Sequence, residues 1–434
     1  MKDQSIQLPI IGQPESAPSR GVDHSHPHHD GEGLHSRDDV AGLPVREEEL
    51  SAPAKPDRRS LLKLMAASIL ADGTYEITNV PAIVDVGIMA DLLRAIGLDV
   101  TVGDPGLVTI VNRGDLTPVA PYELVAQMRA SINVLGPLLT RCGYVRVSMP
   151  GGDDFGSRPI DMHVAGLTAM GATFDLTDDY VEARADRLHG ADIMFDFPSV
   201  GATENVLTAA VLADGVTTID NAAREPELID LCEFLVSMGA QIDGIGTSRL
   251  IVTGVGHDEV SACLHETVPD RIQAATYIAA CAVTGGQIDL LNAQPDHMQM
   301  VLSRFRDMGL DFRALRYGLR VSSEGRMRST DIATLPYPGI ATDYKPLIMT
   351  MLSVADGVAI VTENIYPGRF RYVDELQRLG ADIRTNGHHA VVRGVPRLAG
   401  AEVVSHDIRA GAAMVVAGLA AEGTTTISGV HHID

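Results

Sequence analysis

A pattern that recurs about every 70 residues constrains the fold of this chain more than any other feature. The pattern is a glycine before a β-branched strand, followed by a helix that closes on an apolar residue and glycine; in three copies the strand ends near an asparagine, at Asn79, Asn221 or Asn292. The glycines that begin the copies are Gly73, Gly143, Gly215, Gly286, Gly357 and Gly423. A near-constant period is typical of repeated supersecondary units. Because each copy combines short strands with amphipathic helices, the sequence predicts an α/β protein of six related units.

Three units in each half predict a domain boundary near residues 265–270 and a ligand cleft between the halves. Residues 1–57 are instead rich in Pro, Gly, Ser and acids, with little apolar periodicity. They predict a disordered acidic extension. We therefore expect this extension, a first domain at 58–267 and a second at 268–434. The histidines of the extension could hold a transition metal, but a solvated tail is the simpler interpretation: His24, His26, His28, His29 and His35.

One amphipathic helix is predicted from Ile83 to Ile96. Its apolar residues recur at helical spacing and are expected to face the core: Val84, Met89, Leu92, Leu93 and Ile96.

The charge balance limits the partners of the chain. Its 57 acidic and 34 basic residues give a formal net charge of −23. This charge argues against nucleic acid and against an anionic membrane surface, although a local cationic pocket for a small anion remains compatible with it. The sequence has no secretory signal and no run long enough to span a membrane, so we expect a cytoplasmic protein. Its four cysteines have neither metal-site nor disulfide-framework spacing.

The stretch from Pro150 to His163 carries the most chemistry. Its glycines permit close backbone approach, and Arg158 offers a fork of donors for phosphate or carboxylate. Asp153 or Asp154 could deliver or take a proton. The alternative is a surface turn that caps a helix from Asp161 to Met170.

Several motifs, in order along residues 58–434, resemble the enolpyruvyl transferase family. They are Met128–Ile132, Leu135–Pro137, Pro150–Gly152, Gly156–His163, Ser199–Thr203, Asn221–Glu227, Pro269–Ile272, Asn292–Asp296, Thr342–Asp343, Arg369–Phe370, Asp407–Ala410 and His432–Asp434. The resemblance implies two inside-out α/β barrel domains, each of three βαβαββ units. It also implies transfer of the enolpyruvyl group of phosphoenolpyruvate to a sugar hydroxyl of UDP-N-acetylglucosamine, with release of phosphate. No metal or organic cofactor is implied.

The resemblance also implies roles for individual residues. Asp343 matches the aspartate beside the attacking hydroxyl, although alone it would equally suit a helix N-cap. Asp153 matches the proton donor, and Arg58 a catalytic lysine. Arginines match the anion-binding positions: Arg129, Arg158, Arg369 and Arg409. Further positions match substrate contacts: Arg59, Pro159, Ile160, Asp161, His163, Ser199, Val200, Gly201 and Ile365.

The chain departs from the family pattern at several of these positions. Asp153 stands where cysteine is usual, and Arg58-Arg59 replaces Lys-Asn. Asn133 replaces an aromatic residue, Phe197 a lysine and Gln273 a glutamate. The family's N-terminal strand is not recognisable, and the chain ends at Asp434 before a family arginine and closing helix. We therefore expect the last unit to leave an exposed strand edge or apolar face.

Three functions remain open from the sequence. The first is an enolpyruvyl transferase that acts on UDP-N-acetylglucosamine. The second uses the same chemistry on another uridine nucleotide such as UMP, as in nucleoside-antibiotic pathways. The third is a catalytically weak relative that binds a nucleotide sugar.

Overall fold

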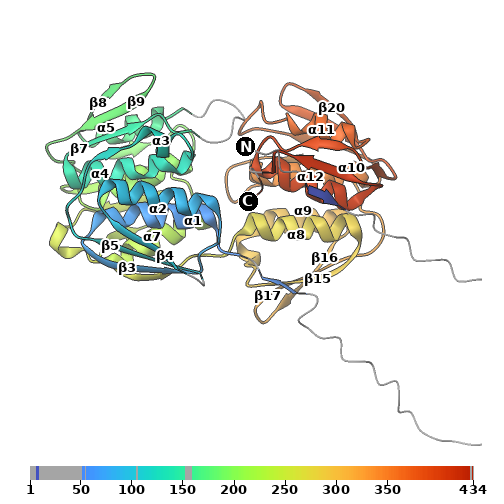
Figure 1. The fold of residues 1–434 in the computed structure, drawn as a ribbon, viewed down its shortest axis with the longest axis horizontal. Helices are drawn as coiled ribbons and strands as arrows, with labels where there is room; N and C mark the ends of the chain where they lie inside the picture. The colour runs from blue at the N-terminus through green and yellow to red at the C-terminus, as the bar shows by residue number, and fades with distance from the viewer. Residues whose placement is uncertain are drawn as a thin grey trace, which may run out of the picture.

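The computed structural model describes residues 6–8, 51–53, 55–103, 106–151, 159–430 and 433. Figure 1 shows two lobes side by side. Chain positions from about 58 to 266 form one lobe, and most of the remainder forms the other, together with residues 6–8 and 51–53. Each lobe has its own hydrophobic core. The first core draws its buried residues from Leu61 to Val260, and the second from Ile272 to Ile427.

Both lobes contain many short strands. In the first lobe they are β3 (Gly73–Thr78), β4 (Asp99–Gly103), β5 (Leu107–Asn112), β6 (Val119–Ala120), β7 (Tyr144–Ser148), β8 (Thr173–Leu176), β9 (Tyr180–Arg184), β10 (Asp192–Met194), β11 (Val216–Asp220), β12 (Gln241–Asp243), β13 (Arg249–Thr253) and β14 (Leu264–Glu266). In the second lobe they are β2 (Ser51–Pro53), β15 (Gly286–Leu291), β16 (Asp311–Leu315), β17 (Gly318–Ser323), β18 (Ile332–Ala333), β19 (Val358–Thr362), β20 (Asp382–Asn386), β21 (His389–Arg393), β22 (Leu398–Ala399), β23 (Glu402–Val404), β24 (Ala421–Glu422), β25 (Thr425–Ser428) and β1 (Ile6–Leu8).

Five four-stranded sheets share one plan. A parallel pair forms one side of each sheet, and two antiparallel strands complete it. The strand orders are β14-β3-β5-β4, β6-β7-β9-β8, β10-β11-β13-β12, β2-β15-β17-β16 and β18-β19-β21-β20. The fold class is therefore mixed α/β, as the alternating sequence pattern predicted.

The recurring glycines and asparagines have a backbone explanation. All six glycines that begin the copies have positive φ, from 67° at Gly143 to 129° at Gly73. Asn79, Asn221 and Asn292 also have positive φ, each just beyond the end of a strand. Glycine and asparagine adopt this left-handed conformation more readily than other residues. The repeat in the sequence therefore marks the turns that enter and leave the strands.

Two strands near the N-terminus differ from the sequence-based expectation. Residues 1–57 were expected to lack regular structure, yet β1 pairs antiparallel with β25 and β2 pairs parallel with β15. The expectation of an exposed edge on the last unit is wrong for β25, which lies between β1 and β23. Three-residue strands have no sequence periodicity to reveal them, and Pro53 is compatible with β2 because β2 is an edge strand.

Helices fill the interior and cover parts of the sheets. They are α1 (Arg58–Ala67), α2 (Val84–Ile96), α3 (Tyr122–Val125), α4 (Leu135–Cys142), α5 (Asp161–Ala169), α6 (Val200–Ala210), α7 (Pro226–Met238), α8 (Arg271–Thr284), α9 (Gln299–Met308), α10 (Lys345–Val354), α11 (Tyr372–Arg378) and α12 (Ile408–Ala420). In the second lobe α8, α10 and α12 pack against one another. Helix α10 is buried from Lys345 to Ser353, because helices surround it on the inside of the sheets. No helix in the described part of the chain is long and apolar enough to cross a membrane.

The two helices expected from the sequence are present. Helix α5 begins at Asp161, and α2 ends at Ile96 as predicted. Met89, Leu92, Leu93 and Ile96 are buried, but Val84 was wrongly assigned to the core and is 55% exposed. Val84 is the first residue of α2 and faces the space between the lobes, where the core no longer extends.

Candidate active site

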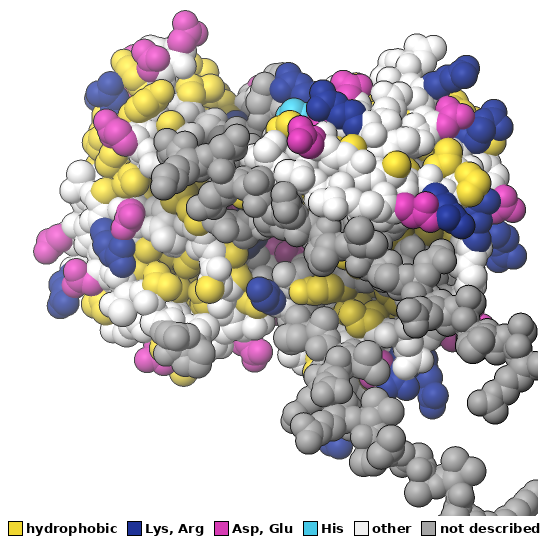
Figure 2. Space-filling view, turned by 45° about the vertical axis from the view of Figure 1, so that its right-hand side comes forward, with side chains coloured by type: hydrophobic (Ala, Val, Ile, Leu, Met, Phe, Trp, Pro, Cys, Tyr) yellow, Lys and Arg dark blue, Asp and Glu magenta, His cyan; other side chains and the backbone are white. Residues whose placement is uncertain are grey.

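A cavity of about 1240 Å³ lies between the two lobes. Residues from the N-terminal ends of α1, α6 and α12 line it, together with Thr342 and Asp343 before α10. The exposed N–H groups at helix N-termini favour anions. On the face drawn in Figure 2, acidic and basic side chains are otherwise interspersed over both lobes. The cavity is therefore a place where a small anion could bind despite the negative net charge.

The cavity gathers most of the residues that the sequence singled out. Its lining includes Arg58, Arg59, Arg129, Pro159, His163, Ser199, Val200, Gly201, Asp343, Ile365, Arg369 and Arg409. Ile160 and Asp161 are not part of it: Ile160 is buried before α5, and Asp161 is exposed at the first position of that helix. Asp153 and Arg158 lie outside the described residues.

Asp343 stands at the centre of a cluster of arginines. Its Oδ2 accepts a hydrogen bond from Nη1 of Arg59 at 3.1 Å, and its Oδ1 accepts one from Nη1 of Arg369 at 2.9 Å. Nε of Arg409 lies 3.8 Å from Oδ1. Burial raises the pKa of Asp343, but the charges of Arg409, Arg369 and Arg59 outweigh burial and hold it well below its ordinary value.

The positions of these groups follow from local structure. Arg409 follows Asp407, whose side chain caps α12 by accepting from the backbone N–H groups of Arg409 and Ala410. Arg59 likewise follows the N-cap Asp57 of α1. Asp343 was considered as an N-cap from the sequence, but it lies in the short 3-10 turn Thr342–Tyr344 without capping a helix.

A second charged network joins the lobes at the wall of the cavity. Glu227, at the start of α7, accepts hydrogen bonds from Nε of Arg271 at 2.9 Å and from Nη2 of Arg271 at 3.3 Å. Both side chains are 3% exposed. Nη2 of Arg59 also donates to Glu227. The sequence motifs contained Glu227 and Arg271, but sequence reasoning gave neither a role.

A buried ion pair between Lys345 and Glu363 holds residues around Asp343 in place. This pair was not identified from the sequence. Nζ of Lys345 lies 2.8 Å from Oε2 of Glu363, and both side chains are fully buried. Glu363 also accepts from the hydroxyls of Thr334 and Thr342 and from the backbone N–H groups of Ile365 and Tyr366. Lys345 donates to the carbonyl oxygen of Arg369 at 2.6 Å. The pair therefore fixes the neighbours of Asp343, Ile365 and Arg369.

The first-lobe wall of the cavity is built around His163. Its ring lies under Gly201, where a Cβ atom would approach the ring to 3.1 Å, so a larger residue at 201 would crowd it. Nδ1 of His163 accepts from the side-chain amide of Asn205 at 3.1 Å, as a neutral imidazole can. Burial and the charge of Arg129 lower the pKa of His163 to about 4.

This shift predicts a pH dependence of stability. The unfolded histidine titrates near 6.5, so between pH 6.5 and 4 the unfolded chain binds more protons than the folded one. The stability is present above pH 6.5 and is lost as the pH falls towards 4, by at most about 3 kcal/mol. We expect His163→Gln to flatten this part of the curve in urea titrations at pH 7, 5.5 and 4.5. The exposed His189→Gln is the control, and an equal slope in all three proteins would contradict the assignment.

The remaining predicted cation of α1 is engaged at the cavity wall. Nη1 of Arg58 lies 3.0 Å from Oδ2 of Asp85, and both side chains are about one quarter exposed. Among the residues that the structure describes, no three His, Cys, Asp or Glu side chains come together as a metal site would require.

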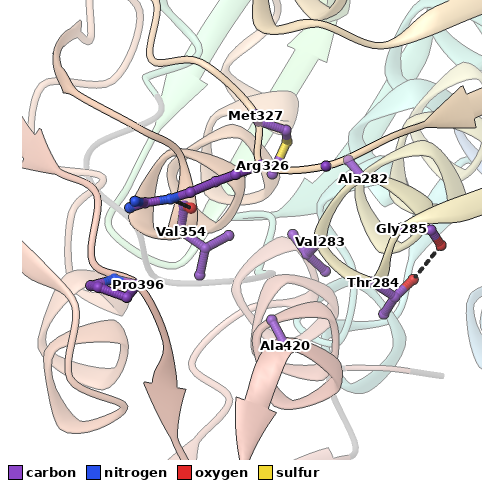
Figure 3. Close-up of a pocket in the computed structure, with 10 residues that line it drawn as sticks. Ala282, Val283, Thr284, Gly285, Arg326, Met327, Val354, Pro396 and Ala420 are labelled. Atoms are coloured by element: carbon purple, nitrogen blue, oxygen red, sulfur yellow. Dashed lines mark hydrogen bonds between the residues drawn. The ribbon is translucent and has the colours of Figure 1, made fainter. Parts of the chain in front are cut away.

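A second cavity, of about 350 Å³, lies at the C-terminal ends of α8, α10 and α12 (Figure 3). Arg326 is the charged residue among its described lining. It donates to carbonyl oxygens of Val354, Ala355, Gly394 and Val395. Since this guanidinium closes off the end of α10, the cavity between the lobes is the better candidate for an active site.

Comparisons with known proteins give the family of the chain. The family model of EPSP synthase (3-phosphoshikimate 1-carboxyvinyltransferase) matches residues 49–434. A UDP-N-acetylglucosamine 1-carboxyvinyltransferase of Nocardia farcinica is 50% identical over 382 residues, which is 87% of this chain and 89% of the relative. The enzyme of the same name from Mycolicibacterium paratuberculosis is 48% identical over 377 residues, 87% of this chain and 90% of the relative.

Solved structures share the fold. The enolpyruvyl transferase NikO from Streptomyces tendae superposes with a TM-score of 0.80 at 22% identity, covering 88% of this chain and 92% of that one. EPSP synthase from Acinetobacter baumannii gives a TM-score of 0.67 at 18% identity, covering 87% and 91%. With a family model that spans almost the whole described chain and relatives at about half identity, the chain belongs to the EPSP synthase family of enolpyruvyl transferases.

Proposed function

We propose that this enzyme transfers the enolpyruvyl group of phosphoenolpyruvate to the 3-hydroxyl of UDP-N-acetylglucosamine and releases phosphate. The observation that carries the proposal is the carboxylate of Asp343, held between arginines of both lobes in the interlobe cavity. Relatives named for this reaction, at 48–50% identity, support it further. In this proposal the first lobe holds the nucleotide sugar, the second lobe supplies the base Asp343, and the arginines bind phosphoenolpyruvate.

The reaction is an addition followed by an elimination. In the addition, the acceptor oxygen bonds to C2 of phosphoenolpyruvate, Asp343 takes the hydroxyl proton, and Asp153 gives a proton to C3. In the elimination, the carboxylate of Asp153 takes a proton from C3 and the bond from C2 to the phosphate oxygen breaks, which restores the vinyl group. Phosphate leaves with the bonding electrons and with the proton that Asp343 had taken. Arg58 lines the cavity where it could stabilise the charge of this intermediate.

The arginines suit the two anionic groups of phosphoenolpyruvate. Guanidinium groups bind phosphate and carboxylate through paired, charge-assisted hydrogen bonds. Arg129, Arg369 and Arg409 line one cavity, and Arg158 is expected to join them from the loop before α5. We assign these four to phosphoenolpyruvate.

Occupation of these arginines would also activate the base. Without ligand, three arginines hold the pKa of Asp343 far below its ordinary value, which makes it a weak base. An anion that binds Arg369 and Arg409 adds negative charge beside Asp343 and raises its pKa. Proton abstraction would therefore follow phosphoenolpyruvate binding.

The nucleotide sugar is assigned to the wall around α5 and α6. Ser199 caps α6 by accepting from the N–H of Ala202, and Val200 and Gly201 follow in its first turn. This helix N-terminus suits a diphosphate. We assign Arg59, Pro159, Ile160, Asp161, His163 and Ile365 to the same substrate, with the role of Arg59 refined below.

We also propose the finer architecture of the family for this chain. Each lobe would be an inside-out barrel of three βαβαββ units, with domains at 58–267 and 268–434 and an extension at 1–57. The five sheets of one plan and the mutually packed α8, α10 and α12 support this description. We place the reaction in the cytoplasm, where phosphoenolpyruvate is formed.

Arg409→Ala should chiefly weaken phosphoenolpyruvate binding. A hydrogen bond to a charged group contributes about 1.5–3 kcal/mol, so the KM for phosphoenolpyruvate should rise about 10- to 100-fold. The dissociation constant of UDP-N-acetylglucosamine, measured by calorimetry, should change little. An effect confined to the nucleotide sugar would remove Arg409 from the phosphoenolpyruvate site.

The enzyme should resist fosfomycin, whose epoxide alkylates a thiol at the position of Asp153. We expect no adduct by mass spectrometry after incubation of the wild-type protein, because a carboxylate is a weaker nucleophile than a thiolate. Asp153→Cys should gain the adduct and lose activity on exposure. A covalent adduct on Asp153 would contradict this prediction.

A second acceptor class deserves testing because of Phe197. Phe197 is 38% exposed and lines the cavity at a position where the family resemblance implies lysine. Loss of that cation weakens the case for a diphosphate there and favours another uridine nucleotide such as UMP. Release of phosphate from phosphoenolpyruvate with each acceptor in turn distinguishes the two.

A further inference from the structure

We propose that Arg59 is a positioning residue, anchored in the first lobe, that orients the carboxylate of Asp343 in the second lobe. The inference rests on the proposed function, in which Asp343 is the base. It changes the role expected for Arg59, from a substrate contact to a group that acts through Asp343.

The guanidinium of Arg59 is fixed along one edge by two buried carboxylates. Its Nη2 lies 2.7 Å from Oδ2 of Asp57 and its Nε 3.3 Å from Oδ1 of the same residue. Nη2 also donates to Glu227, and the side chains of Asp57 and Glu227 are 1% and 3% exposed. Such a forked contact leaves the guanidinium little rotational freedom.

The free edge of this fork reaches across the cavity. Nη1 of Arg59 donates to Oδ2 of Asp343 at 3.1 Å, while Arg369 binds Oδ1 from the second lobe. The two oxygens of the carboxylate are therefore held from opposite lobes. That arrangement determines the rotation of the carboxylate, and hence where its lone pairs point.

The charge count argues against Arg59 as the main cation for a substrate anion. Asp57 and Glu227 already balance Arg59 and Arg271 before Asp343 is counted. A phosphate that recruited Nη1 of Arg59 would have to displace the carboxylate of Asp343.

The network connects base orientation to the arrangement of the lobes. Glu227 contacts Arg59 and, through Arg271, the second lobe at α8. Arg59 belongs to the first lobe and Asp343 to the second, so their bond forms only when the lobes approach each other as they do here. Asp343 would thus be fully oriented only in this closed arrangement.

Steady-state kinetics of Arg59→Gln and Arg59→Lys test the role. Arg59→Gln should lower kcat about 10- to 100-fold, the range of strongly coupled neighbours, while both KM values stay within about threefold. Arg59→Lys should recover part of kcat, since it keeps the charge but not the fork. Arg113→Gln, at an exposed pair with Asp99, is the control and should match wild type.

The anchor gives an independent variant. Asp57→Asn keeps an acceptor for the cap of α1 but loosens Arg59, so it should lower kcat in the same direction. It should add nothing in an Arg59→Gln background, because Asp57 acts through Arg59. If Arg59→Gln folds poorly, the loss of kcat in Asp57→Asn alone, with both KM values near wild type, tests the role.

The opposite results overturn the role. A KM raised tenfold or more with kcat near wild type, or effects of Asp57→Asn and Arg59→Gln that multiply, would make Arg59 a substrate contact or a structural residue. If the wild-type enzyme is active and either of these results is obtained, only this inference is contradicted. A wild type that releases no phosphate with any uridine nucleotide contradicts the proposed function, and the inference with it.

Discussion

Replacing Asp343 by asparagine should lower kcat by about 10²- to 10⁴-fold, the usual contribution of a general base. Asparagine keeps the size and the hydrogen-bonding oxygen of the side chain but cannot accept the hydroxyl proton. The dissociation constant of UDP-N-acetylglucosamine should stay within a few-fold, because its assigned contacts lie mainly on α5 and α6. Assays of phosphate release give kcat, and calorimetry gives the dissociation constant of UDP-N-acetylglucosamine.

Loss of an exposed Asp–Arg pair far from the cavity should not produce this result. Asp382→Asn removes an exposed partner of Arg393 on the second lobe and should leave kcat unchanged. Unchanged turnover in Asp343→Asn would take Asp343 out of the mechanism. An equal loss of nucleotide-sugar binding and turnover would point to a collapsed cavity instead.

Glu363→Gln should lower the free energy of unfolding by about 3–5 kcal/mol, the cost of breaking a buried ion pair. Glu363 and Lys345 are fully buried. Burial lowers the pKa of Lys345 to about 8, so at pH 7 the ammonium is charged and would lose its counter-charge. Urea denaturation at pH 7 gives the change in stability.

A double variant separates the lost pair from a general packing defect. Lys345→Met with Glu363→Gln should be more stable than Glu363→Gln alone, because no uncompensated charge stays buried. Glu422→Gln, at the exposed pair with Arg397, should change stability by under about 1 kcal/mol. A double variant as unstable as the sum of both single variants would show that the pair itself contributes little.

The sequence predicted features that local chemistry determines. Glycine and asparagine recur because strands are entered and left through positive φ, and α5 begins where the polar stretch meets an apolar run. Of the described residues chosen by resemblance, all but Ile160 and Asp161 line one cavity. Three-residue strands such as β1 and β2 carry no periodic signal, so they were missed.

The ionic partners could not be predicted for a different reason. Arg59 binds Glu227, which is 168 positions away in the sequence, and Asp343, which is 284 positions away. Nothing in the sequence around Lys345 indicates that its partner is Glu363, or that both are buried. Such pairings depend on how lobes and helices pack, and a charged residue looks alike in sequence whether it is solvated or paired.

The central claim is tested most directly by phosphate release from phosphoenolpyruvate with purified protein, first with UDP-N-acetylglucosamine and then with UMP. We expect release of phosphate with the nucleotide sugar, with one enolpyruvyl product formed for each phosphate. Release with UMP alone would assign the enzyme to the second acceptor class. If neither acceptor gives release although UDP-N-acetylglucosamine binds measurably, the proposed transferase activity is contradicted. The protein would then be one that binds a nucleotide sugar without this reaction.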